Sequence, residues 1–242
     1  METHDSKVIG HWPELPYAAW RDTYAMLHMY MQIIGKLRLE LCPKMNQWWN
    51  VPFYVTSRGM TTSPMPYGDR TLECVFDFVS HDLSFTASDG QIRVLGLVPR
   101  TVADFHAEVF ATLEAMGVSV RITDLPCEVP NPIPFTLDTQ HRSYDAEYVT
   151  RFWTIVSGMD TVFKDFRALF RGKCSPVHFF WGSFDLAVTR FSGRLVSPRP
   201  GVDRITRDAY DEEVSSVGFW PGDGNVPYPT LYSYMAPEPA GY

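Results

Sequence analysis

Apolar residues recur at helical spacing along three stretches of the chain. The two longest cover residues 17–41 and 145–170, and each carries a broad apolar face with polar residues opposite. A third stretch covers residues 101–116. Thr101 at its start is a good helix-capping residue, and Gly117 after its end supplies the left-handed conformation that commonly ends a helix. The pattern therefore predicts three amphipathic helices.

Shorter apolar runs between these helices predict β-strands. The expected strands cover residues 51–57, 71–79, 83–87, 91–98 and 118–122. Asp89-Gly90 joins two of them and is a strong hairpin signal, so consecutive strands are expected to pair antiparallel. Residues 174–193 are apolar on both faces and predict one long, buried central strand. A short helix is expected at residues 208–215.

These elements predict an α+β fold in which a largely antiparallel sheet is covered by two long amphipathic helices. Residues 1–16 are expected to form an N-terminal tail and residues 17–242 a single domain. Residues 48–59 and 180–190 each follow a long helix, contain tryptophan and lead into a strand. This similarity raises the hypothesis of two related α/β halves, with a boundary near residues 125–142.

Charge and composition narrow the classes of partner. The chain has 242 residues and a formal net charge of −7, and its basic residues are scattered, so nucleic acids and anionic membranes are not expected partners. No apolar run is long enough to span a bilayer, and no signal peptide is recognisable at the start. The four cysteines are widely spaced, as expected for reduced thiols rather than a disulfide framework. Aromatic residues make up 14% of the chain and suit either a rich core or a ligand pocket.

Common catalytic and cofactor motifs are missing from the sequence. There is no nucleophile elbow, phosphate-binding loop, dinucleotide fingerprint or zinc-protease motif. No cofactor is therefore expected.

The segment KCSPVHFFWGSFDLAVTRFSG, at residues 173–193, resembles a family of uncharacterised bacterial proteins known only as a domain of unknown function. The resemblance extends over nearly the whole chain. It includes the polar stripe of the first helix and residues 12–16, 48–52, 218–222 and 237–241. It implies a cytoplasmic bacterial protein and brings no known activity or catalytic residues.

Polar residues interrupt the apolar segment at residues 174–193. On a single strand, His178, Gly182 and Arg190 share one face, and Asp185 lies on the other. Buried polar groups need partners, so these side chains either pair structurally or face a ligand. The functional hypothesis is that His178 and Arg190 line the floor of a pocket, and that Gly182 leaves room for the ligand.

Within this hypothesis His178 is the general acid or base. Glu213 or Asp185 would orient its imidazole, and Arg58 and Arg190 would hold an anionic group of the substrate.

A second candidate catalytic residue, His28, lies on the polar stripe of the first helix. Gln32 and Lys36 share this stripe and are candidates for substrate binding. Trp181 and Trp220 are expected to form walls of the pocket, and Trp220 would do so as part of a lid.

Together these residues predict an enzyme that acts on a small polar or anionic metabolite by metal-independent acid–base chemistry, in a cleft between the two halves. Two alternatives remain open. One is a non-catalytic small-ligand-binding or sensor protein. The other is a metal-dependent enzyme that uses His28, His81 or His178 with carboxylates. A purely structural role would instead predict an exposed apolar patch and no deep pocket.

Overall fold

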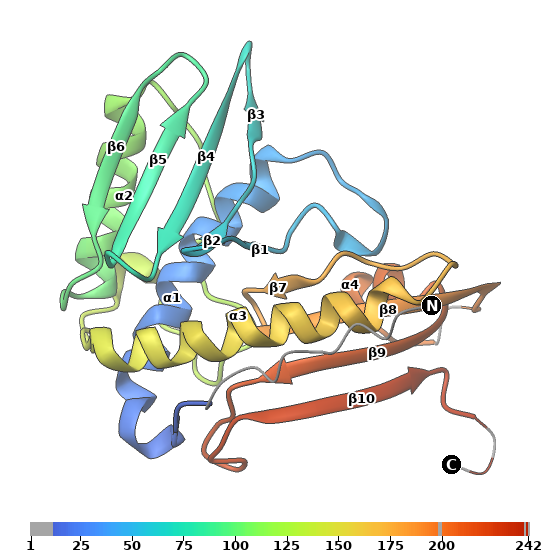
Figure 1. Cartoon of the computed structure of the whole chain (residues 1–242). Coiled ribbons are helices and arrows are strands. Elements are labelled where there is room, and N and C mark those ends of the chain that lie inside the picture. The colour runs from blue at the N-terminus through green and yellow to red at the C-terminus, as the bar shows by residue number, and fades with distance from the viewer. Residues whose placement is uncertain (1–11, 198–199, 240, 242) are drawn as a thin grey trace, which may run out of the picture.

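Two antiparallel sheets form the framework of the protein (Figure 1). The computed structural model describes residues 12–197, 200–239 and 241. The first sheet has the order β1-β2-β4-β5-β6, and β3 also pairs with β4. Its strands are β1 (Tyr54–Val55), β2 (Gly59–Thr61), β3 (Met65–Tyr67), β4 (Arg70–Asp77), β5 (Asp82–Ala87) and β6 (Ile92–Gly96). The second sheet has the order β10-β9-β8-β7. Its strands are β7 (His178–Phe180), β8 (Asp185–Leu195), β9 (Glu212–Trp220) and β10 (Thr230–Ala236).

A side-chain cap begins each described α-helix except the first, which follows Pro16. The α-helices are α1 (Tyr17–Leu41), α2 (Val102–Ala115), α3 (Ala146–Ala168) and α4 (Arg204–Ala209), and the 3₁₀ helices are η1 (Asn46–Trp48) and η2 (Phe135–Leu137). The Thr101 hydroxyl accepts the Asp104 amide at 3.0 Å, and Asp145 caps α3 in the same way. The three predicted helices and the antiparallel α+β fold are confirmed.

Aromatic side chains join the helices and sheets into one core. Tyr30 of α1 stacks on Phe105 of α2 with 3.6 Å between ring centroids. Trp20 of α1 stacks on Phe152 of α3 at 5.5 Å, and Phe152 in turn stacks on Phe184 at 5.3 Å. Much of the aromatic content thus stabilises the contacts of α1 with α2 and α3, as expected for rings of this size.

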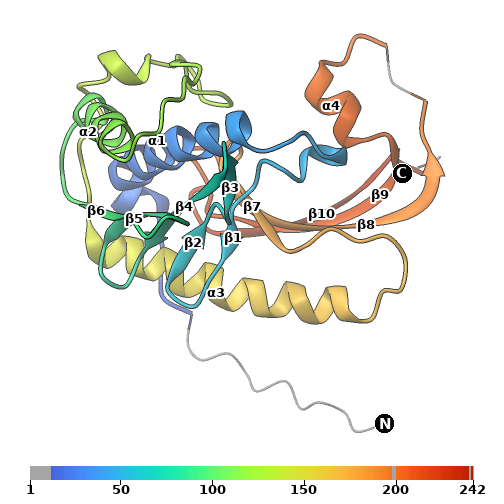
Figure 2. The same ribbon diagram turned by 90° about the horizontal axis from the view of Figure 1, so that it is seen from above.

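The four-stranded sheet separates two layers. α3 packs against one face, and α4 lies on the opposite side (Figure 2). The two sheets meet at a single bridge among the described residues, an antiparallel pair of Phe53 and Phe179. Each of these residues donates its amide to the other's carbonyl at 2.8 Å.

The prediction of a single long strand at residues 174–193 is wrong. The chain instead reverses between β7 and β8, in a turn where Phe184 has a φ of 59°. His178 pairs with Ala187, and Phe180 pairs with Asp185. Directly opposed residues of an antiparallel pair share a face, so Asp185 joins the face of His178 and Arg190 falls on the other face.

The C-terminal region also differs from expectation. The expected helix at residues 208–215 is α4, which ends at Ala209, and β9 follows it. The segment at residues 218–222 therefore begins as part of a central strand and is not a lid. Residues 118–122 form no strand. The hairpin at Asp89-Gly90 is confirmed, with Gly90 at a φ of 92°.

Each half of the chain holds a long helix followed by an antiparallel sheet. Trp48 precedes β1, and Trp181 lies in the turn between β7 and β8. Relatedness of the two halves stays a hypothesis.

Candidate functional site

A pocket of about 340 Å³ opens on the face of the four-stranded sheet opposite α3. Its floor is the sheet, and its other walls come from η1 and the residue after it, from the proline-rich connection at Glu128, and from the end of α4. The polar lining residues are Gln47, Glu128, His178, Ser183, Asp185, Thr189, Tyr210, Ser216, Tyr232 and Tyr234. The apolar lining residues are Trp49, Phe180, Ala187, Phe191, Ala209 and Val214.

Strand register fixes the order of side chains on the pocket floor. His178, Ala187, Gly218 and Tyr232 lie in one row across β7, β8, β9 and β10. The next row places Thr189 beside Ser216 and Tyr234, and the Thr189 and Ser216 hydroxyls are 2.9 Å apart. Alternate residues of each strand thus build one polar and aromatic surface.

Asp185 is the central carboxyl of this surface. It is 8% exposed, and it accepts hydrogen bonds from the hydroxyls of Ser183 and Tyr232. Burial raises the pKa of Asp185 against the opposing effect of these two donors. Burial, and then the charge of Asp185, raise the pKa of Tyr232, so its phenol stays protonated and can donate a hydrogen bond.

Glycine at position 218 is what allows Tyr232 to reach Asp185. A Cβ atom at Gly218 would lie 2.2 Å from both Cζ and Oη of Tyr232. The Tyr232 phenol therefore crosses β9 through space that the side chain of any other residue at position 218 would occupy.

Glu128 supplies the second carboxyl. Its backbone has a φ of 54°, a conformation disfavoured for a residue with a side chain. A Cβ atom at Gly182 would lie 2.6 Å from Glu128 Oε1, so glycine leaves room for this carboxyl. Burial, and then the nearby Asp185 and Asp203, raise the pKa of Glu128. Among the described residues the Glu128 carboxyl has no hydrogen-bond or ion-pair partner.

The polar stripe of α1 lies behind the pocket and positions its walls. The Gln32 amide pairs with both backbone groups of Cys127, accepting from its N–H at 2.9 Å and donating to its carbonyl at 2.8 Å. Glu128 is the next residue, so Gln32 holds the strained segment in place. His28 Nε2 lies 2.9 Å from the Gly182 carbonyl and donates to it, which fixes the turn between β7 and β8.

His28 and Gln32 are thus positioning residues, and the expectation that they act on a substrate directly is not supported. Burial lowers the pKa of His28 to about 4, so its imidazole is neutral near pH 7. Lys36 is also buried and lies beside Cys127 outside the pocket lining, and burial lowers its pKa.

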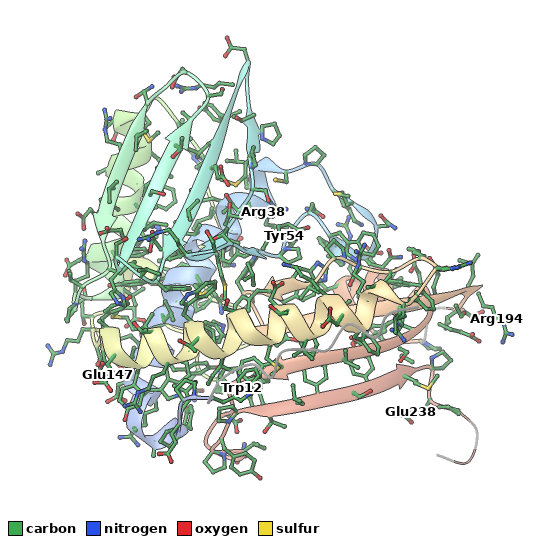
Figure 3. All side chains as sticks on the ribbon, viewed as in Figure 1. Trp12, Arg38, Tyr54, Glu147, Arg194 and Glu238 are labelled. Atoms are coloured by element: carbon green, nitrogen blue, oxygen red, sulfur yellow. The ribbon has the colours of Figure 1, made fainter. Side chains whose placement is uncertain are left out.

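His178 lines the pocket but is deeply buried. It is 1% exposed, and its Nδ1 atom has no hydrogen-bond partner among the described residues. Burial, and then the nearby Arg38 guanidinium, lower the pKa of His178 to about 3. Arg38 also lies 5.5 Å from the centre of the Tyr54 ring, and Figure 3 shows these two residues close together near β7. The imidazole is therefore neutral near pH 7, and it lies one row of side chains from Asp185.

Backbone strain gathers around the pocket. Gln47 and Glu128 line it, and both have positive φ values, 46° and 54°. Trp48 and Phe184, each adjacent to a lining residue, have φ values of 58° and 59°. Such conformations cost on the order of 1 to 3 kcal/mol each and cluster at functional sites in proteins.

Several residues predicted from the sequence lie elsewhere. Arg190 is on the α3 side of the sheet, with its guanidinium 3.5 Å from the centre of the Phe166 ring. Glu213 faces the same side and accepts the Ser192 hydroxyl at 2.9 Å. Arg58 pairs with Asp77 in the first sheet. The expectation that these residues share a site with His178 is wrong.

The two tryptophans are not pocket walls. Trp181 packs against Gly35 of α1, where a Cβ atom would lie 2.3 Å from its ring, and its indole donates to the Val51 carbonyl at 2.9 Å. Trp220 ends β9 beside the Tyr24 hydroxyl.

Sequence reasoning missed most of the pocket lining. The alternation of Tyr232 and Tyr234 is a period-two pattern that could have indicated one face of a strand. Glu128 and Gln47 lie in irregular segments whose position depends on tertiary contacts, so no local signal points to them.

Among the described residues, no group of three or more histidine, cysteine, aspartate or glutamate side chains is placed to hold a metal ion. No helix in this part of the chain combines the length and apolarity needed to cross a membrane.

Comparison with known proteins places the chain in a family without assigning an activity. No curated protein and no solved structure shows significant similarity to it. The model of a family of unknown function, DUF5996, matches residues 12–242, nearly the full length. The chain therefore belongs to this family of unknown function.

Proposed function

We propose that the protein binds a small organic molecule in the pocket on the four-stranded sheet. The observation that carries this proposal is the buried Nδ1 atom of His178, a pocket-lining residue, which has no hydrogen-bond partner among the described residues. A polar group shielded from water without a partner costs about 1 to 3 kcal/mol. A ligand that supplies the missing hydrogen bond would recover that free energy.

The size and lining of the pocket support the same proposal. A volume of about 340 Å³ falls at the lower end of the range for small-molecule sites. Aromatic side chains form its apolar surface, and a few convergent polar groups give direction, as ligand sites require. Gln47 and Glu128 line the pocket and both have positive φ values, and strained backbone of this kind clusters at functional sites.

The lining favours a polar ligand but not an anionic one. Neither lysine nor arginine is among the residues that line the pocket, and both arginines expected to bind an anion lie elsewhere. The proposed ligand is therefore a polar molecule without an anionic group.

Acid–base catalysis is a second candidate function. The observation in its favour is that a neutral imidazole, His178, and a carboxyl of raised pKa, Asp185, face the same pocket. Such a pair can exchange protons with a bound substrate. Binding without turnover would favour the first candidate, and loss of turnover in His178→Ala would favour the second.

A ligand screen with a blocked pocket tests the proposal. Ala187 lies at the centre of the floor, so Ala187→Leu should fill the pocket. Ser233→Leu on the exposed side of β10 is the matched control, with the same side chain outside the pocket. Compounds that raise the thermal midpoint of the natural protein should act equally on Ser233→Leu and fail on Ala187→Leu. Ligands that bind Ala187→Leu undiminished would sink the proposal.

A further inference from the structure

The charge of the pocket lining is one-sided. Two carboxyls, Asp185 and Glu128, face the pocket, and a third, Asp203, is close enough to raise the pKa of Glu128. Among the described residues, neither lysine nor arginine is part of the lining. Two cations lie behind it: the Arg38 guanidinium near His178, and Lys173, whose Nζ atom lies 4.5 Å from the centre of the Phe191 ring and pairs with Glu212.

Aromatic rings line the same pocket as these carboxyls. Six of the lining side chains are aromatic: Trp49, Phe180, Phe191, Tyr210, Tyr232 and Tyr234. The faces of such rings carry partial negative charge and attract cations, most strongly when water is excluded. Lys173 Nζ already lies 5.7 Å from the Trp49 ring and 4.5 Å from the Phe191 ring, so Phe180 and the three tyrosines are the rings that remain for a positively charged ligand.

Most hydroxyls in the pocket already have partners. Thr189 and Ser216 pair at 2.9 Å, and so do Tyr210 and Tyr234. Tyr232 donates to Asp185, together with Ser183. The hydrogen-bonding capacity that remains at this end is on the carboxyl oxygens, which accept when ionised. The site therefore calls for a ligand that donates hydrogen bonds or carries positive charge.

We infer that the ligand is a small organic cation, whose ammonium group lies between Glu128 and Asp185 and against the tyrosine rings. This inference rests on the proposed function and names the chemical class that the same pocket takes. The cationic nitrogen lies at the carboxyls, and the rest of the ligand extends past His178, which lies in the adjacent row of side chains. Glu128 is the main charge partner, because the Asp185 carboxyl already accepts from Ser183 and Tyr232, whereas the exposed Glu128 carboxyl accepts from no described residue.

Pairs of cations and their neutral isosteres test the inference. Choline is compared with 3,3-dimethylbutan-1-ol, and pentylammonium with pentan-1-ol, by titration calorimetry or saturation-transfer NMR at millimolar concentration. The cations should bind and the alcohols should bind at least tenfold more weakly. Glu128→Gln, which keeps the shape and removes the charge, should weaken the cations by about tenfold or more and leave the alcohols unchanged. Glu213→Gln, on the other face of the sheet, is the matched control and should change neither.

Three outcomes overturn the inference. These are equal binding of cations and alcohols, unchanged cation affinity in Glu128→Gln, and no binding of either cation. None of them removes the proposed function, which fails separately if every ligand from the wider screen still binds Ala187→Leu. If a neutral ligand binds the natural protein but not Ala187→Leu, the pocket is a binding site and its selectivity for cations is contradicted.

Discussion

The phenol ring of Tyr232 occupies the space in which a side chain of Gly218 would lie, with Cζ and Oη each 2.2 Å from the Cβ position. The two residues are direct partners across β9 and β10. Through this overlap the Tyr232 hydroxyl reaches Asp185, two strands away. The geometry of the buried carboxyl therefore depends on the absence of a side chain at position 218.

Gly218→Ala should displace the Tyr232 ring and break its hydrogen bond to Asp185. We expect the free energy of unfolding to fall by about 1 to 3 kcal/mol, from overpacking and from the lost donor. Urea denaturation measures this change. Combining Gly218→Ala with Tyr232→Ala should cost less than the sum of the two single changes, because the ring that clashes is gone. Strictly additive effects would show that the two residues do not compete for space.

His28→Gln should flatten the dependence of stability on pH. The folded-state pKa of His28 is lowered from 6.5 to about 4 by burial, so between these values the unfolded chain holds more protons. The stabilisation from a neutral His28 is full above about pH 6.5, declines as the pH falls, and is gone below about pH 4. The difference is on the order of 3 kcal/mol.

Denaturation midpoints at pH 7.5 and pH 5 measure this effect. The natural protein should lose more stability between them than His28→Gln, whose amide can still donate to the Gly182 carbonyl. His178 contributes with the same sign and is present in both proteins, so it cancels in the comparison. Equal slopes would contradict the assignment of His28 as a buried neutral group.

Gln32→Ala should release the wall that carries Glu128. Both hydrogen bonds between the Gln32 amide and the Cys127 backbone are lost, at a cost of about 1 to 3 kcal/mol for the groups left unpaired. The strained backbone of Glu128 should then relax, and affinity for ligands of the pocket should fall. Gln140→Ala, at an exposed position, is the matched control. Amide hydrogen exchange at Cys127 and Glu128 reports the local loosening, and unchanged protection would contradict the positioning role.

The long helices could be predicted because their signals are local and repeated. Residues 17–41 keep an apolar face over many turns between two prolines, and α1 has those bounds. Asp89-Gly90 likewise encodes its own hairpin, since glycine adopts the positive φ that the turn needs.

The reversal between β7 and β8 could not be predicted in the same way. The turn sequence Trp181-Gly182-Ser183-Phe184 is largely apolar, and Phe184 adopts its positive φ because the ring is buried among others in the core. Missing this turn changed the face assigned to every residue after it. For that reason the prediction that His178 and Arg190 share a face is wrong. Asp185, predicted on the opposite face, lies on the face of His178.

The candidate site depended even more on distant contacts. Glu128 lies in a connection without regular structure, and its position comes from Gln32, 95 residues earlier in the chain. The polar stripe of His28 and Gln32 can be recognised in the sequence. Whether these side chains contact a ligand or hold the walls of a site depends on tertiary contacts that the sequence does not give.

The bridge between Phe53 and Phe179 bears on how the protein unfolds. Main-chain bonding between the sheets is limited to that one pair in the described part of the chain, whereas each sheet is bonded continuously within itself. Cohesion between the sheets therefore rests on aromatic packing through α3, where Trp153 contacts Phe78 next to β4 and Phe152 contacts Phe179 of β7. Weakening that packing would part the sheets while each kept its own ladder. The wall at Gln47 would stay with the pocket floor, because its side-chain amide donates to Asp211 at 2.6 Å, next to the start of β9.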